Sequence, residues 1–262
     1  MEPTAVIRII HCLCVLLVCL ASWSQASAGR NTQMDHLLRV AEDVAAEGQQ
    51  RMAAIHALGE LGDPRAVVPL IRILERDMRA RTGVWAAAIP ALGMLGDPAA
   101  GKILIRALNK RDDDWLGREM AAEALGRIGA VSAIPALSHA ARLADTRESA
   151  IAALARIGTP ASVPSLIEAL DASEPAATRQ RAMEGLRRIG RPAVGALSRA
   201  ALEAYPEAPM TEKRVTLCRL LQEIGGRQAL EALRGLATDS DPRVRACARG
   251  AAPLDHQRHK HE

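Results

Sequence analysis

The stretch HALGELGDPRAVVPLIRIL, residues 56–74, decides the fold, because close copies of it return along the chain. Each copy has a small, apolar run, then a Leu-Gly or Ile-Gly pair, then a second apolar run. The copies are PALGMLGDPAAGKILIRAL (90–108), EALGRIGAVSAIPALSHAA (123–141), AALARIGTPASVPSLIEAL (152–170) and EGLRRIGRPAVGALSRAAL (184–202). A unit of this length that recurs is the signature of a repeat architecture.

One glycine closes each Leu-Gly or Ile-Gly pair and sets the period. These glycines are Gly62, Gly96, Gly129, Gly158, Gly190 and Gly225, at intervals of 29 to 35 residues. Upstream of the first, Ala54, Ala57 and Leu58 are three and four positions apart, which indicates one apolar face of a helix. We expect the glycine to end that helix in the left-handed conformation that only glycine adopts cheaply.

A second helix is expected to begin just after each glycine. Four dipeptides supply an N-cap followed by proline at the first helical position: Asp63-Pro64, Asp97-Pro98, Thr159-Pro160 and Asp241-Pro242. Asp145 and Glu148 have the spacing of a capping box. Prolines within the second apolar runs are expected to bend the second helix, namely Pro69, Pro135 and Pro164.

The predicted fold class is therefore all-α, an α-α superhelix or solenoid of about seven antiparallel helix pairs over residues 29–252. The pairs fall near residues 32–61, 64–95, 98–128, 131–157, 160–189, 192–224 and 226–252. Composition agrees, because a chain with no Phe, one Tyr and three Trp must build its core from small aliphatic contacts. Residues 253–262 have no apolar period, and we expect a disordered tail that contains His256, His259 and His261.

The N-terminus is predicted to be a signal peptide over residues 1–28. Arg8 and His11 precede the apolar run CLCVLLVCLA, and Ala26-Ser27-Ala28 has the A-x-A pattern of a cleavage site. The alternative is a retained N-terminal anchor. Val18 excludes a lipoprotein, whose lipidated cysteine follows a small residue. Cleavage after Ala28 would place the protein in the periplasm or outside the cell.

Cleavage would leave two cysteines, Cys218 and Cys247, in an oxidising compartment. They could pair, or each could be a small buried hydrophobic residue. We favour two free, buried thiols, because the two positions fall at different phases of the repeat.

The pattern Arg-x-x-Ala, then Ala-Leu-Gly-x-Leu-Gly-Asp-Pro, then Ala-Val-Pro-x-Leu resembles HEAT-like repeats of the short type also found in phycobilisome bilin lyases. The resemblance covers nearly all of residues 29–252. It implies a helical scaffold, with a bilin-lyase-like enzyme or accessory factor, of lyase or oxidoreductase type, as the alternative. Tetratricopeptide and ankyrin repeats are excluded because their marker residues are missing.

Catalytic chemistry and cofactors have little support in the sequence. Deoxyhypusine hydroxylase, which the chain resembles in architecture, binds iron through His-Glu pairs, but the matching positions here hold other residues. These are Arg51-Met52, Arg118-Glu119, Arg147-Glu148 and Arg179-Gln180. His56 and His139 are isolated, and no catalytic constellation has a defensible spacing. We therefore expect no catalytic residue, no metal and no cofactor.

Two columns of equivalent positions are predicted to line a concave groove. One holds Arg127, Arg156 and Arg188, with Arg187 beside them, and would form a basic ridge for an acidic partner. The alternative for these arginines is helix capping or pairing with Glu123, Glu148 and Glu184. The other column holds Arg51, Trp85, Arg118, Arg147, Arg179 and Arg214, where we favour a structural role, since Asp/Arg ladders hold such repeats together.

The predicted function is an exported protein-binding scaffold, with partner contacts at Arg127, Arg156, Arg187, Arg188, Trp85 and Trp115. Trp85 and Trp115 form either an exposed aromatic anchor or a filler between repeats. Residues 203–212 form a contact loop or a spacer. Nucleic acid is not an expected partner, because the net charge is only +4 and Glu60 and Glu223 end the ridge.

Overall fold

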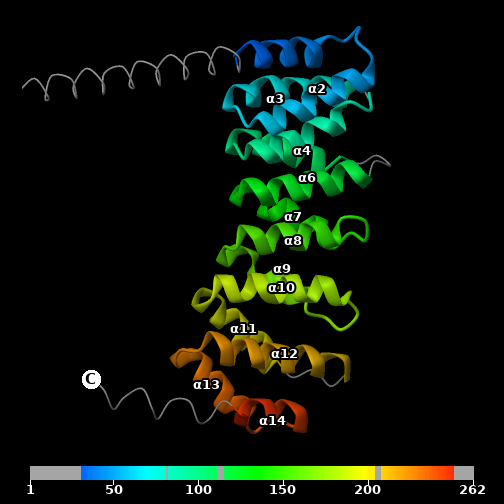
Figure 1. The fold of residues 1–262 in the computed structure, drawn as a ribbon. Coiled ribbons are helices and arrows are strands. Elements are labelled where there is room, and N and C mark those ends of the chain that lie inside the picture. Colours follow the sequence, from blue (N-terminus) through cyan, green and yellow to red (C-terminus); the bar gives the residue numbers. More distant parts are fainter. Residues whose placement is uncertain (1–30, 81, 111–114, 204–207, 251–262) are drawn as a thin grey trace, which may run out of the picture. The chain divides into compact units, whose positions relative to one another are not determined.

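The computed structural model describes residues 31–80, 82–110, 115–203 and 208–250. Within these ranges the regular structure consists of fourteen α-helices and short 3-10 turns, without a β-strand (Figure 1). None of the described helices is long and apolar enough to cross a membrane. The chain divides into two compact units, Met1–Leu95 and Gly96–Glu262. The predicted signal peptide and the predicted tail lie outside the described residues and stay predictions.

The first unit contains two helix pairs. A helix over residues 31–42 pairs with α2 (Gly48–Leu61), and α3 (Val67–Ala80) pairs with α4 (Trp85–Leu95), after the 3-10 turn η1 (Pro64–Ala66). Helix α4 packs against both α2 and α3. Ile55, Leu58, Leu70 and Leu92 are fully buried between them.

The second unit contains five helix pairs. They are α5 (Gly101–Leu108) with α6 (Trp115–Ile128), α7 (Ile134–Ala140) with α8 (Arg147–Ile157), α9 (Val163–Glu168) with α10 (Ala176–Ile189), α11 (Val194–Leu202) with α12 (Ala208–Ile224), and α13 (Arg227–Leu236) with α14 (Pro242–Gly250). The turns η2 (Pro98–Ala100), η3 (Val131–Ala133), η4 (Pro160–Ser162) and η5 (Arg191–Ala193) lead into α5, α7, α9 and α11. Helices α6, α8, α10, α12 and α14 form one layer, in which each contacts the next. The all-α class and the predicted seven pairs are confirmed.

The predicted turn with positive φ forms at each of the six closing glycines, although Gly190, with ψ of −136°, is outside the left-handed helical region. All six closing glycines have φ between 64° and 71°. At Gly158, for example, φ is 64° and the backbone N–H donates to Leu154 O at 3.1 Å, which satisfies a free carbonyl at the end of α8. The glycine thus turns the chain toward the next helix pair at low cost.

Three of the four predicted N-caps form. The carboxylates of Asp63, Asp97 and Asp241 accept backbone N–H groups two residues ahead, at 2.8–2.9 Å. Thr159 makes no capping bond, and its hydroxyl is buried without a partner in the described chain. The first two caps open the short 3-10 turns that lead into α3 and α5, and the third opens α14.

The predicted capping box at Asp145 and Glu148 is wrong. Thr146 occupies the N-cap of α8 and makes no side-chain capping bond. The Asp145 carboxylate accepts instead from Arg118, and the Glu148 carboxylate from Arg181. Both acidic groups are held by arginines of neighbouring repeats, which offer charged donors in place of backbone N–H groups.

The predicted proline bends are also wrong. Pro135 and Pro164 lie in the first turn of α7 and α9, and Pro69 is the third residue of α3. The first backbone N–H groups of a helix have no intrahelical partner, so proline removes nothing there. The one proline inside a described helix is Pro90 of α4.

Close backbone contact explains a core with so few aromatic rings. A Cβ atom added at Gly126 of α6 would lie 2.7 Å from Ala153 Cα of α8, closer than atoms can pack. Gly185 of α10 approaches Ala155 of α8 in the same way, at 2.8 Å from its Cα. Small residues on both helices therefore let α6, α8 and α10 pack closely.

Candidate functional site

Arginines near the start of successive helices join neighbouring repeats, and we call them the clamp arginines. They are Arg51, Arg118, Arg147, Arg179 and Arg214. Arg51 Nε donates to Ala41 O at 3.1 Å, and its Nη2 donates to Asp77 Oδ2 at 2.5 Å. Arg214 Nε donates to Ala201 O at 3.0 Å, and its guanidinium pairs with Asp239. The guanidinium groups of Arg51 and Arg214 thus each bind a carbonyl at the end of the preceding helix and a carboxylate of the next repeat.

Of the remaining clamp arginines, Arg118 and Arg147 follow the same scheme, whereas Arg179 binds only carbonyl oxygens among the described residues. Arg118 donates to Lys110 O and pairs with Asp145. That hydrogen bond lowers the pKa of the Asp145 carboxyl below its ordinary value. Arg147 donates to Ala141 O and lies 3.5 Å from Glu174, and Arg179 donates to the carbonyls of Ala172 and Glu174. The structural role predicted for this column is confirmed.

Trp85 takes the clamp position in one repeat, and its side chain is only 3% exposed. A side chain so deeply buried offers no surface to a partner, so the predicted partner contact at Trp85 is wrong and the filler role is correct. Trp115, the first residue of α6, is 53% exposed, beside Leu116 at 50%. If the protein has an exposed aromatic anchor here, Trp115 alone forms it, because Trp85 is buried.

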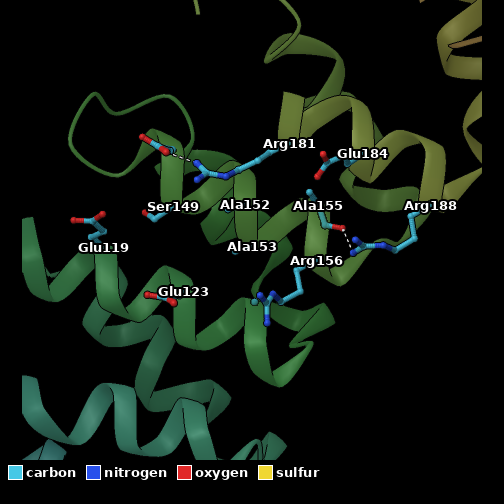
Figure 2. Close-up of a pocket in the computed structure, with 12 residues that line it drawn as sticks. Glu119, Glu123, Ser149, Ala152, Ala153, Ala155, Arg156, Arg181, Glu184 and Arg188 are labelled. Atoms are coloured by element: carbon cyan, nitrogen blue, oxygen red, sulfur yellow. Dashed lines mark hydrogen bonds and ion pairs between the residues drawn. The ribbon is translucent and has the colours of Figure 1, made fainter. Parts of the chain in front are cut away.

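A groove of about 590 Å³ crosses α6, α8 and α10 in the second unit. We call it the α6–α8–α10 groove. Its floor consists of small residues of α6 and α8, and charged residues form its walls (Figure 2). The lining residues are Glu119, Glu123, Gly126, Glu148, Ser149, Ala152, Ala153, Ala155, Arg156, Arg181, Glu184 and Arg188.

The groove carries charges of both signs. Four glutamates and three arginines line it, so its net charge is close to neutral and slightly negative. Figure 2 shows Glu119 and Glu123 of α6 on one side and Arg156 and Arg188 on the other. The basic ridge expected from the sequence is therefore replaced by an acidic wall on α6 and a wall of mixed charge on α8 and α10. The difference comes from glutamates that line the groove one or two helical turns before an arginine of the column, namely Glu119, Glu123, Glu148 and Glu184.

Three of the four predicted arginines have partners within the protein. Arg127 Nη2 donates to Glu123 Oε1 at 2.7 Å, one turn away on α6. Arg187 Nε donates to Glu223 Oε2 at 2.6 Å, and Arg188 Nη1 donates to Ala155 O at 3.0 Å. Only Arg188 of these three lines the groove. Arg127 and Arg187 therefore form ion pairs, and Arg188 caps the end of a neighbouring helix. Both roles were the alternatives that the sequence left open.

Arg156 differs from its neighbours. Its side chain is exposed in the last turn of α8, lines the groove, and makes no hydrogen bond or ion pair with any residue that the structure describes. Glu119, on the opposite wall, is likewise unpaired among the described residues and is half-buried. A guanidinium with all five N–H donors available, beside a floor of small residues, is suited to bind a carboxylate bidentately.

Histidines contribute no chemistry to the groove. His56 Nδ1 lies 3.6 Å from Glu60 Oε2 on the exposed surface of α2, and His139 is in the last turn of α7. No cluster of three or more His, Cys, Asp or Glu side chains in the described ranges is arranged to hold a metal ion. The three histidines of the predicted tail lie outside these ranges.

Comparison with known families agrees with the repeated helix pairs. The family of HEAT repeats matches residues 80–147, and the PBS lyase HEAT-like repeat matches residues 50–76 and 146–172. The chain is a HEAT-like repeat protein. Its matched segments include α2, α4 and α8, together with the turns that follow α2 and α8.

Two solved structures are similar to this HEAT-like repeat protein. Human deoxyhypusine hydroxylase in complex with glycerol is 23% identical, with a TM-score of 0.45 over 86% of this chain and 96% of that chain. A chain of the CpcE–CpcF complex of phycocyanin lyase from a Nostoc species is 25% identical, with a TM-score of 0.42 over 77% of this chain and 80% of that chain. No curated protein matches the HEAT-like repeat protein in sequence.

The sequence of the HEAT-like repeat protein did contain a signal for the residues that the prediction missed. Counting back four and eight positions from the arginine column gives Glu123 and Glu119 on α6, Glu148 on α8, and Glu184 on α10. Residues four apart lie on the same helix face, so these acids had to share the groove with the arginines. If the arginine column had been extended two helical turns toward the start of each helix, the sequence would have predicted a groove of mixed charge.

Proposed function

We propose that the protein is an exported scaffold, periplasmic or secreted, that binds another protein through the α6–α8–α10 groove. Recognition takes place on a preformed helical surface, and no covalent bond is made or broken. The observation that carries the proposal is the exposed guanidinium of Arg156, which has no partner among the described residues, in the middle of a groove whose other arginines are engaged.

The charges of the groove determine what kind of partner fits. A partner carboxylate would bind Arg156, and a partner lysine or arginine would bind Glu119 on the opposite wall, which has no partner in the part of the chain that the structure describes. The partner segment is therefore of mixed charge, and a uniformly acidic one would face Glu119, Glu123 and Glu184. Complementary charges on both walls fix the register of a bound segment and exclude partners of a single sign.

Trp115 extends this surface with an apolar contact. It lies one helical turn before Glu119 on α6, so both side chains are on the same face of the helix. Exposed tryptophans are among the residues that contribute most to the free energy of protein association. We infer that a partner residue packs on Trp115 while its neighbours meet the charged walls.

Export is supported by the sequence features of residues 1–28. The apolar run, the basic residues before it and Ala26-Ser27-Ala28 after it are the parts that a signal peptidase substrate needs. N-terminal sequencing of the protein from a native envelope fraction tests this part, and the expected first residue is Gly29.

Capture experiments test the groove. The protein, Arg156→Glu and Arg127→Glu are immobilised at equal density and exposed to the same envelope fraction. Arg127→Glu is the control. It makes the same change of charge in the same column, but Arg127 is already paired with Glu123 and does not line the groove. We expect a partner that wild type and Arg127→Glu retain and Arg156→Glu loses, with unchanged helicity by circular dichroism. A partner retained equally by all three would overturn the proposal.

A small organic ligand is the second candidate occupant of the groove. Its volume of about 590 Å³ falls within the range of ligand pockets. No aromatic side chain is among the residues that line it, and charged residues dominate the walls. An absorption spectrum of the freshly purified protein discriminates the two, because a bound tetrapyrrole absorbs visible light and a protein partner does not.

A further inference from the structure

Two cysteines lie on α12 and α14, which pack against each other at the end of the second unit. Cys218 of α12 is completely buried, and Cys247 of α14 is half-buried; both are free thiols in the structure. They are also the two cysteines that remain beyond residue 28. Neither takes part in the α6–α8–α10 groove.

The contacts of Cys247 place its sulfur against the face of α12 that carries Cys218. Cys247 Sγ lies 3.8 Å from Val215 O and 4.0 Å from Gln222 Oε1, both on α12. Gln222 Nε2 in turn donates to Cys247 O at 2.5 Å. Val215 and Gln222 are one turn before and one turn after Cys218, so all three are on one face of α12. The Cys247 sulfur, held between Val215 and Gln222, therefore lies on the stretch of α12 that contains Cys218.

The packing of the other repeats gives the same register independently. Gly126 of α6, eight residues after clamp Arg118, packs on Ala153 of α8, six residues after clamp Arg147. The contacting positions are thus offset by two residues relative to the clamp residues of their helices. The same offset recurs where Gly59 packs on Ala91 and where Ala155 packs on Gly185.

Arg245 corresponds to a clamp arginine in α14, because it donates to the carbonyls of Asp239 and Ser240 before its own helix. Cys218 is four residues after Arg214, and Cys247 is two residues after Arg245. In the other repeats the contact joins positions eight and six residues after the clamp residues. The two cysteines are four and two residues after theirs, so they form the equivalent contact one helical turn earlier in both helices. The two cysteines occupy different positions within the repeat, which favoured isolated thiols in the sequence analysis. This difference of two positions matches the stagger between neighbouring helices and therefore brings the cysteines together.

We infer that Cys218 and Cys247 are a dithiol site that closes to an intramolecular disulfide between α12 and α14. The oxidant is of the disulfide class, either a small disulfide such as glutathione disulfide or an oxidoreductase that carries one. The site would act in the oxidising compartment that export implies, but its chemistry does not depend on the groove.

The order of the two exchange steps follows from burial. The more exposed Cys247 thiolate attacks the oxidant disulfide, forms a mixed disulfide and releases one thiolate. Cys218 then gives up its proton and attacks the Cys247 sulfur, releasing the second thiolate. In all, two protein thiols lose two electrons and two protons, and one oxidant disulfide becomes two thiols. Burial, and next the neighbouring Cys247, raise the pKa of the Cys218 thiol, which makes Cys218 the poorer first nucleophile and leaves the first attack to Cys247.

The cross-link would secure the last described helix. Helix α14 contacts α12 and α13 and has no further repeat to pack on among the described residues. Terminal repeats of such stacks lack one neighbour and open most easily. A bond from α14 to the buried face of α12 replaces part of the missing stabilisation and restricts the unfolded chain.

Oxidation of the full-length protein tests the inference without changing its sequence. One sample is incubated with glutathione disulfide and one with dithiothreitol. Both are then digested without reduction, so that the Cys218–Cys247 pairing is separated from bonds that involve Cys12, Cys14 or Cys19. We expect a linked peptide containing Cys218 and Cys247, and a melting temperature several degrees higher in the oxidised sample than in the reduced one.

Two results would overturn the inference. One is a glutathione adduct that stays on Cys247 while Cys218 remains a thiol, and the other is a cross-linked protein that melts below the reduced form. Cys247→Ser is the matched control, because it retains the buried Cys218 and should show no difference between the two treatments. A positive result with no partner captured on the groove would leave this site standing and the proposed function refuted.

Discussion

Arg51 Nη2 donates a hydrogen bond of 2.5 Å to Asp77 Oδ2, and both side chains are almost completely buried, at 4% and 2% exposed. The same geometry joins Arg118 to Asp145 and Arg214 to Asp239 in later repeats. Because these arginines also bind carbonyl oxygens at helix ends, they are held in place on both sides. They stabilise the stack and are not available to a partner.

Arg51→Met is expected to destabilise the protein by about 3 kcal/mol. Removing one member of a buried ion pair leaves the other charge uncompensated, which costs about 3–5 kcal/mol. The lower end applies because Arg76 Nε still donates to Asp77 Oδ1 at 2.9 Å. Urea unfolding followed by circular dichroism measures the loss.

The double variant Arg51→Met with Asp77→Leu is the control for that prediction. It removes both charges and fills the space with apolar atoms, so it should unfold at a higher urea concentration than Arg51→Met alone. A double variant less stable than the single one would show that the pair itself, and not the isolated carboxylate, determines the loss.

Gly126→Ala is expected to cost about 1–3 kcal/mol, the usual range for overpacking. The new Cβ would lie 2.7 Å from Ala153 Cα, so α6 and α8 must move apart. Gly101→Ala is the matched control in the first turn of α5, where the nearest atom is Ala130 Cβ at 4.0 Å. We expect this control to be neutral or to stabilise by up to about 1 kcal/mol. Equal melting temperatures for the two variants would contradict the close packing.

Asp97→Ala is expected to cost about 1 kcal/mol, because Asp97 Oδ1 accepts the Ala99 N–H at 2.8 Å. Thr159 occupies the equivalent position but makes no capping bond, so Thr159→Ala should cost clearly less. Chemical unfolding of both variants side by side checks the difference. If the two losses were equal, the aspartate would not be acting as a cap.

Acid should narrow the stability gap between wild type and Asp145→Asn. The bond from Arg118 lowers the pKa of Asp145 in the folded state, so its contribution is complete above the unfolded value of about 3.9 and is lost as pH falls through the lowered value. The side chain is 33% exposed, which limits the contribution to about 1 kcal/mol or less. Unfolding curves at pH 7 and pH 2 measure the gap, and an undiminished gap at pH 2 would contradict the assignment.

The helical framework was predictable because it depends on local chemistry. The glycine at each turn, the aspartates before proline and the apolar face of each first helix act over a few residues, and the structure places them as expected. The predicted capping box at Asp145 and Glu148 was wrong because arginines of other repeats bind these carboxylates, although their spacing fits a capping box. Sequence spacing along one helix says nothing about such competitors.

The groove was only partly predictable for the same reason. A column of equivalent positions located Arg156 and Arg188, but which arginine has a free guanidinium depends on Glu123, Glu223 and a carbonyl of Ala155. Trp85 shows the converse case, since a large residue at a repeat position can fill space in one repeat where arginine pairs in the others. Such outcomes follow from packing between repeats, which sequence alone does not specify.

The affinity of the captured partner for Arg156→Glu tests the central claim most directly. Titration calorimetry on wild type, Arg156→Glu and Arg127→Glu compares three proteins of the same fold, two of them with the same change of charge. We predict that Arg156→Glu weakens binding by about a hundredfold, in the range for a lost charge-assisted contact, while Arg127→Glu stays within about threefold of wild type. Equal dissociation constants for Arg156→Glu and wild type would show that the partner does not use the groove.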